Sequence, residues 1–312
     1  MKGKTLLRVF GVMFLALTFA ALPFISACAP APTAPTAPTA PKPEEQPLKY
    51  GMSICMTGPA AEKGSPMGHA KLDCIKYINE ELGGVNGHPI IADWYDNTYS
   101  AAKAATIVKK LMDDGALFFT TNSSAMMMAS MEIANRAGFA GIASFSSPIC
   151  TNPPQHIYAQ MPDYGDDWAA FADYYMKNIW KGTGKPKMAM HLLNNTTGYG
   201  ARDAAICLAE EMGIELVGRE EHTTTTISEM ESMTRIKALN PDVLFISSTP
   251  APTAVIIKNA YDLGMYPGVV IGCAHASFTK VLVDIAGAKI TEGVYGVFPT
   301  VNWAIMYQVW LR

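Results

Sequence analysis

Short apolar segments alternate with amphipathic ones through most of the sequence, and few folds accommodate that order. The segments expected to be strands are 49–56, 89–95, 116–120, 139–145, 187–193, 214–219, 242–247 and 268–273. Apolar residues recur at helical spacing between them, as in 101–112, where Ile107, Val108 and Leu111 share one face. Alternation of this kind requires a parallel sheet with helices on both faces. The sequence therefore predicts an α/β fold.

The expected helices fall into two groups, separated by a loop rich in Pro, Tyr and Asp at 146–165. One helix is expected around Ile75, Ile78 and Leu82, and the others at 101–112, 125–137, 167–180, 199–212, 228–239 and 253–263. The pattern predicts two Rossmann-like lobes, 48–164 and 165–299. Because ligands of parallel sheets bind at the carboxyl ends of the strands, we expect a cleft lined by strand-to-helix loops.

The first 28 residues have the order of an export signal. Three basic residues precede an apolar run at 9–25, and the small residues Ser26 and Ala27 stand before Cys28, as in lipoprotein signal peptides. The alternative is a membrane-spanning anchor, for which the run is shorter than the ~20 residues required. We expect a signal peptide at 1–28, with Cys28 as the lipidated first residue of the mature protein.

An Ala-Pro-Thr repeat occupies residues 29–47. Proline removes backbone donors and fixes φ, so this stretch is expected to be an extended, solvated tether. A lipid, a tether and a globular body together predict a protein held on the extracytoplasmic side of a membrane, in the periplasm or at the cell surface.

Composition and missing motifs exclude several classes of function. With 24 Lys+Arg against 27 Asp+Glu, the chain has no basic excess for nucleic acid. It has no GxGxxG after a strand, no GxSxG and no HExxH, and 182–186 lacks the Walker Ser/Thr. The cysteines show no CxxC spacing for zinc. We therefore expect a small-molecule binder that is not an enzyme and holds no metal or cofactor.

Several short motifs, in their order and spacing, resemble the type 1 solute-binding proteins of branched-chain amino acid ABC importers. They are Thr57-Gly58-Pro59-Ala60-Ala61, Gly83-Gly84-Val85-Asn86-Gly87-His88-Pro89-Ile90, Tyr95-Asp96, Leu111-Met112-Asp113-Asp114-Gly115, 194–200 and Asn240-Pro241-Asp242-Val243. The resemblance covers about 48–298 and implies a Venus-flytrap mechanism, with ABC permease and ATPase subunits as partners. A ligand-sensing module of the same fold is the alternative, and a lipid anchor favours transport over it.

The resemblance also implies which loops hold the ligand. In the family, two hydroxyl-rich loops of the first lobe bind the ligand's carboxylate, and here they contain Ser123 and Ser124, then Ser144, Phe145 and Ser146. Hydroxyls and free amides at the start of a helix can meet an anion along a favourable dipole. Ordinary helix capping by Ser123 and Ser124 is the alternative, and both roles are compatible.

Two further residues match family positions at the cleft. Tyr199 matches a tyrosine that closes over the solute from the second lobe, and its alternative is a surface aromatic in a glycine turn. Lys63 stands where relatives place an aromatic or polar residue at the cleft mouth. It would add positive charge for an anionic solute, and a solvated lysine is its alternative.

The solute class is predicted from a departure from the family. Ala274 stands where amino-acid-binding relatives place an acid that pairs with the ligand's ammonium. A buried ammonium without a partner is costly, and we expect no substitute carboxylate nearby. We therefore expect an aromatic or aliphatic acid, with Phe145 and Tyr199 against its tail and His275 as a donor. The alternatives are a surface role for His275 and a branched-chain or other amino acid as the solute.

The C-terminal residues depart from the family pattern. Residues 293–299 resemble the strand that leads toward the last crossing between lobes, but relatives continue well beyond it. Residues 300–312 are therefore expected to begin a truncated C-terminal part, and the first lobe is expected to lack a covering helix.

Overall fold

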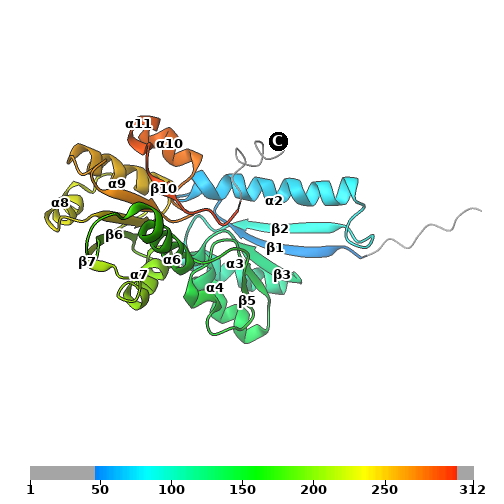
Figure 1. Cartoon of the computed structure of the whole chain (residues 1–312). Helices are drawn as coiled ribbons and strands as arrows, with labels where there is room; N and C mark the ends of the chain where they lie inside the picture. The colour runs from blue at the N-terminus through cyan, green and yellow to red at the C-terminus, as the bar shows by residue number, and fades with distance from the viewer. Residues whose placement is uncertain (1–45, 301–312) are drawn as a thin grey trace, which may run out of the picture. The chain divides into compact units, whose positions relative to one another are not determined.

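Two five-stranded parallel sheets make up the computed structural model, which describes residues 46–300 (Figure 1). The predicted signal peptide with Cys28, most of the predicted tether and residues 301–312 lie outside this range. Within the described residues, no helix is long and apolar enough to cross a membrane. The predicted α/β fold with two parallel sheets is confirmed.

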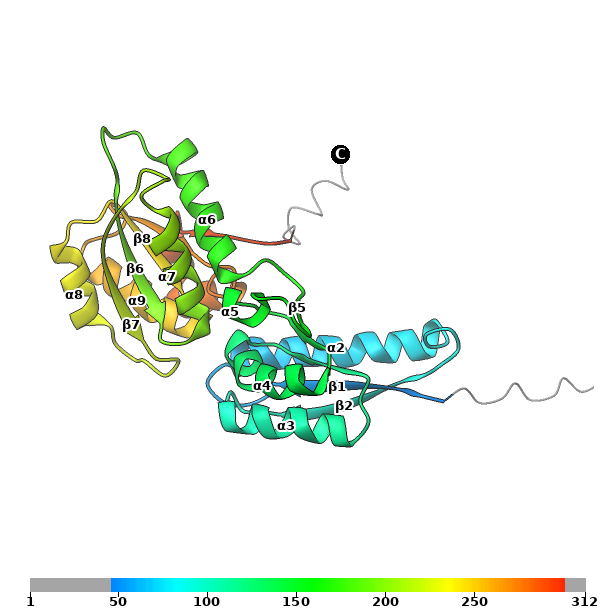
Figure 2. The ribbon, with the colours of Figure 1, turned by 90° about the horizontal axis from the view of Figure 1, so that it is seen from below.

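The first sheet has the strand order β2-β1-β3-β4-β5, and we call this sheet with its helices the first lobe. Its strands are β1 (Leu48–Ile54), β2 (Ile90–Asp96), β3 (Phe118–Thr121), β4 (Gly141–Ala143) and β5 (Ile157–Ala159). Its helices are α2 (Ala61–Glu81), α3 (Ala101–Asp113), α4 (Ser124–Ala137) and α5 (Pro148–Thr151). Helix α2 covers one face, and α3 and α4 cover the other (Figures 1 and 2). Strand β5 lies in the segment expected to be a loop, because three residues with one buried side chain carry no periodic signal.

Local signals set the helices of the first lobe. Helix α3 begins after Ser100, whose side chain accepts from the Lys103 amide, and it buries the three apolar residues predicted to face inward. Helix α4 ends at Gly138, whose φ of 65° suits glycine. Leu82 was expected to share the inner face of its helix, but it is 61% exposed because α2 ends one residue before it.

The second sheet has the order β10-β9-β8-β6-β7, and with its helices it forms the second lobe. Its strands are β6 (Lys187–Leu193), β7 (Glu215–His222), β8 (Val243–Ser247), β9 (Val270–Cys273) and β10 (Tyr295–Gly296). Its helices are α6 (Tyr164–Tyr174), α7 (Thr196–Leu208), α8 (Met230–Ala238), α9 (Pro250–Asp262), α10 (Lys280–Ala286) and α11 (Ala288–Thr291), with a π-helical turn, η2 (Tyr175–Ile179), after α6. Helices α10 and α11, which are short, were not predicted.

The central strands of this sheet are buried on both faces, as expected of a parallel sheet. Along β8, Val243 and Phe245 pack into one apolar cluster with α6 and α7, whereas Leu244 and Ile246 pack into another with α8, α9 and α10. Side chains alternate between the faces of a strand, so one short apolar segment supplies two cores.

Candidate functional site

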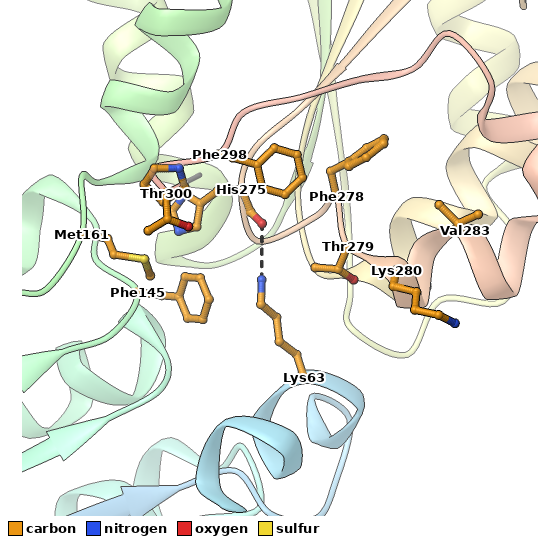
Figure 3. A pocket seen from close by; sticks show the side chains of 11 residues that line it. Lys63, Phe145, Met161, His275, Phe278, Thr279, Lys280, Val283, Phe298 and Thr300 are labelled. Carbon is orange, nitrogen blue, oxygen red and sulfur yellow. Dashed lines mark hydrogen bonds between the residues drawn. The ribbon is translucent and has the colours of Figure 1, made fainter. Parts of the chain in front are cut away.

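A cavity of about 550 Å³ is lined by side chains from both lobes (Figure 3). We call it the main pocket, and its lining includes Lys63, Phe145, His275, Phe278, Thr279 and Phe298. Three of the residues expected at the site are therefore brought together. Within the part of the chain that the structure describes, no acidic residue lines this cavity.

Lys63 reaches the main pocket from the first turn of α2. Its Nζ donates hydrogen bonds to the carbonyl oxygens of Ala276 at 3.0 Å and of His275 at 3.4 Å, and lies 4.2 Å from the Phe145 ring centroid (Figure 3). Burial lowers the pKa of Lys63 to about 7, against the opposing attraction of Asp167 and Glu62. The Lys63 amine is therefore protonated below about pH 7, and in the described residues no carboxylate lies at ion-pair distance from it.

His275 follows β9 and is 4% exposed. Its Nδ1 lies 2.5 Å from Asp167 Oδ2, and its backbone N–H donates to the same oxygen at 3.0 Å. Because an ionised carboxylate only accepts, Nδ1 is the donor of this pair. The other ring nitrogen, Nε2, is buried and has no hydrogen-bond partner.

Asp167 owes its position to the way α6 begins. The Asp163 side chain accepts hydrogen bonds from the amides of Gly165 and Asp166. The Asp166 side chain in turn accepts from the Asp163 amide, which completes a capping box. The helix thus starts at Tyr164, three residues before the predicted start, and places Asp167 in its first turn, 2% exposed. The expectation that no carboxylate stands near the site was wrong, although His275 already occupies this one.

A small polar hollow of about 30 Å³ adjoins the main pocket and shares Lys63 and Phe145 with it. Ser123, Tyr99 and Thr249 contribute hydroxyl groups to its lining. Ser123 stands at the N-cap of α4, but its side chain makes no capping hydrogen bond. The Thr249 hydroxyl is buried without a partner. The hollow is therefore lined by hydroxyl-bearing residues beside Lys63, although the Tyr99 hydroxyl already accepts from Asn195.

The other serines expected at the site do not line either cavity. Ser124 Oγ lies 2.9 Å from Thr196 Oγ1, in α7. Ser144 Oγ accepts from Lys71 Nζ at 2.9 Å, under α2, where burial lowers the pKa of that lysine to about 8. Ser146 is fully buried. Successive residues after a strand alternate in direction, so Phe145 reaches the pocket while its two serine neighbours turn away.

Tyr199 and Ala274 also lie outside both cavities. The Tyr199 hydroxyl donates to Glu221 Oε2 at 3.3 Å, and Arg202 lies over its ring. Ala274 is fully buried in the apolar cluster between the second sheet and α6. Sequence analysis did not indicate Asp167, Thr249 or Phe298 as site residues, because none of them belongs to a recognised motif.

The buried cysteines are poorly suited to thiol chemistry, and the described residues hold no cluster of metal ligands. All five cysteines between residues 46 and 300 are free thiols, and burial raises the pKa of Cys55 to about 12 and of Cys150 to about 11. A reactive cysteine requires the opposite shift. No three His, Cys, Asp or Glu side chains of this range are placed to hold a metal ion.

Solved structures with a similar fold include proteins named for ABC transport or for binding a solute. A fatty acid ABC transporter substrate-binding protein from Thermomonospora curvata aligns with a TM-score of 0.73 at 20% identity, covering 80% of this chain and 63% of its own. A branched-chain amino acid ABC transporter protein from Thermus thermophilus, with bound valine, aligns with a TM-score of 0.71 at 20% identity, covering 80% and 64%. A leucine-binding protein from Thermotoga maritima aligns with a TM-score of 0.71 at 19% identity, covering 85% and 75%.

These likenesses show a shared type 1 fold, and the aligned part spans less than two thirds of the fatty-acid and valine proteins. No curated protein matches the sequence. The periplasmic binding protein family matches residues 47–306, which is most of the chain. The protein therefore belongs to the periplasmic binding protein family.

Proposed function

We propose that the protein is the extracytoplasmic solute-binding component of an ABC importer. It captures a small carboxylate-bearing solute between its lobes, with aromatic and aliphatic acids favoured, and delivers it to permease and ATPase subunits. Family membership and the names of the structural neighbours support this role. A ligand-sensing module of the same fold is the second candidate, because the family match does not distinguish a receptor partner from a permease.

The charge of the main pocket is the observation that carries the solute class. Lys63 presents an ammonium to it, whereas Lys280, which also lines it, is paired with Asp284. His275 Nε2 is buried without a partner, and no acid is found in the described lining. A buried anion requires a cation or a hydrogen-bond donor, which the Lys63 ammonium supplies, whereas a buried ammonium would find no carboxylate in the described lining.

The shape of the site favours a solute with a polar head and an apolar tail. Lys63 and Phe145 stand where the hydroxyl-lined hollow meets the larger cavity. A carboxylate placed near Lys63 would leave its tail toward Phe145, Phe278 and Phe298. The fatty-acid neighbour supports a solute without an ammonium group, whereas the valine and leucine neighbours support the alternative of a branched-chain amino acid.

The test is a screen of the purified protein against matched pairs by thermal shift and calorimetry. We expect 4-methylpentanoate to bind more tightly than leucine, and benzoate more tightly than phenylalanine, by roughly tenfold or more, which is about 1.4 kcal/mol. Mass action then raises the melting temperature more with the better ligand of each pair, at equal ligand concentration. Tight binding of leucine with no response to the acids would restore the amino-acid alternative.

The location at a membrane is proposed from the lipoprotein signal. Replacing Cys28 by Ala is expected to abolish incorporation of labelled palmitate and to leave a soluble or uncleaved precursor, because the modified thiol is lost. Fractionation and labelling of cells that express the two forms provide the measurement. Unchanged membrane attachment, with no label on the wild type, would contradict the proposal.

A further inference from the structure

The surroundings of His275 are those of a site for a cation. Its ring lies between the rings of Phe145 and Tyr164, with centroids 5.0 and 5.1 Å away and interplanar angles of 16° and 9°. At the end of this slot, Asp167 Oδ2 lies 2.5 Å from Nδ1. Aromatic faces attract cations, and a buried carboxylate needs a partner. The slot is filled by the protein's own imidazole.

His275 separates this slot from the main pocket. The histidine lines the pocket (Figure 3), whereas Asp167 does not, and the side chains of both are 2% exposed. A solute in the pocket therefore meets His275, and not the carboxylate of Asp167 behind it. Two lysines are found in the described lining. Lys280 is paired with Asp284, whereas Lys63 has no carboxylate in contact.

We propose that His275 sets the charge class of the solute. Its imidazole pairs with the Asp167 carboxylate, as an ammonium or amidinium group of a solute otherwise would. The pocket therefore accepts solutes that have a carboxylate and no cationic group. This inference rests on the proposed function and assigns its selectivity to one side chain. Removing that side chain would open an aromatic slot ending in an unpaired carboxylate, and a cationic group could then enter it from the pocket.

The variant His275→Ala tests this exchange. Imidazole, in its protonated form, is expected to raise the melting temperature of the variant and to leave that of the wild type unchanged, because it refills the slot. The affinity for leucine relative to that for 4-methylpentanoate is expected to rise by roughly 100-fold, because the buried Asp167 carboxylate regains a partner in the leucine ammonium. Thermal shift and calorimetry on the full chain measure both effects.

Two control variants isolate the carboxylate. The double variant with His275→Ala and Asp167→Asn is expected to respond to neither imidazole nor leucine, since the slot no longer carries charge. His275→Gln, whose amide can donate to Asp167, is expected to keep the wild-type preference. A folded His275→Ala protein that gains neither imidazole nor leucine binding overturns the inference, as does an equal gain in the double variant.

The outcomes separate the inference from the proposed function. A wild type that binds neither leucine nor the acid removes the proposed function, while the imidazole response still decides whether His275 fills a cation slot. If the His275→Ala variant does not fold without a ligand, recovery of folded protein when it is refolded with imidazole supports the inference. Without such recovery, His275→Ser is measured in its place, and the lack of an imidazole response in that variant overturns the inference.

Discussion

Acidification from pH 6.5 to pH 4 is expected to lower the free energy of unfolding of the second lobe by about 3 kcal/mol, at about 1.4 kcal/mol per unit of pKa shift. The cause is His222, at the end of β7, which is 4% exposed. Burial, followed by the proximity of His191, lowers its pKa from 6.5 to about 3. The unfolded chain therefore takes up a proton first, so the stability is complete above pH 6.5 and is lost as the pH falls toward 3.

The contacts around His222 explain why it stays neutral. Its Nδ1 lies 2.9 Å from His191 Nδ1, so the two nitrogens share one proton, and its Nε2 lies 2.6 Å from Ser248 Oγ. Glu229 acts in the same direction. Burial alone would raise its pKa, but hydrogen bonds, first from His191 and then from Ser232, lower it to about 2. Its contribution is lost from about pH 4.5 downward, which extends the decline.

Hydrogen exchange of the β6 and β7 amides, followed from pH 7 to pH 4, reports this lobe alone after correction for the intrinsic exchange rate. The variant His222→Gln is expected to be less stable at pH 7 and to show a shallower decline, because glutamine does not titrate. His69→Gln, at an exposed position of α2, is the matched control and is expected to follow the wild type. An undiminished decline of about 3 kcal/mol in His222→Gln would assign the effect to other groups.

Binding of the carboxylate solute is expected to weaken by roughly tenfold for each pH unit above about 7, because the Lys63 ammonium is lost there. The Lys63 ammonium donates to the carbonyls of Ala276 and His275, and the charges that act on it are those of Asp167 and Glu62. Stability changes in the opposite sense. The folded pKa lies below the ordinary 10.5, so the unfolded chain holds the proton longer and stability rises from pH 7 to about 10. Deprotonation of Lys63 does not destabilise the fold in this pH range, so it cannot weaken binding by unfolding the protein.

Calorimetry between pH 6 and pH 9 with 4-methylpentanoate measures this dependence. Lys63→Arg keeps a charge throughout the range and is expected to bind with little change from pH 6 to pH 9. Lys63→Met is expected to bind weakly at every pH. A wild type whose affinity for the acid stays constant from pH 6 to pH 9 would remove Lys63 from the binding of the carboxylate, and the melting temperature at each pH serves as the control for folding.

Elements with long, regular patterns were predictable from local sequence. Strand β6 has the predicted bounds, and α3 buries the three residues predicted to face inward, because apolar periodicity and capping act over neighbouring residues. The short elements β5 and α11 were not predicted, since so few side chains show no period. The start of α6 was misjudged because the capping box at Asp163 was not recognised.

The candidate site was only partly predictable for a different reason. Sequence similarity indicated the loops, and Lys63, Phe145 and His275 do line one cavity, with Ser123 beside them. Direction within a loop depends on the backbone turn after each strand, so Ser144 faces Lys71 instead of the pocket.

The sequence by itself determined the order of strands and helices, and with it the two parallel sheets, because these follow from hydrophobic period and turn residues. Only the tertiary structure decided the electrostatics of the site. Asp167 and His275 are 108 residues apart, and burial brings them into a 2.5 Å contact that no local pattern specifies. Long-range packing determines which charges are paired and which stay open, and therefore which solute class the pocket can hold.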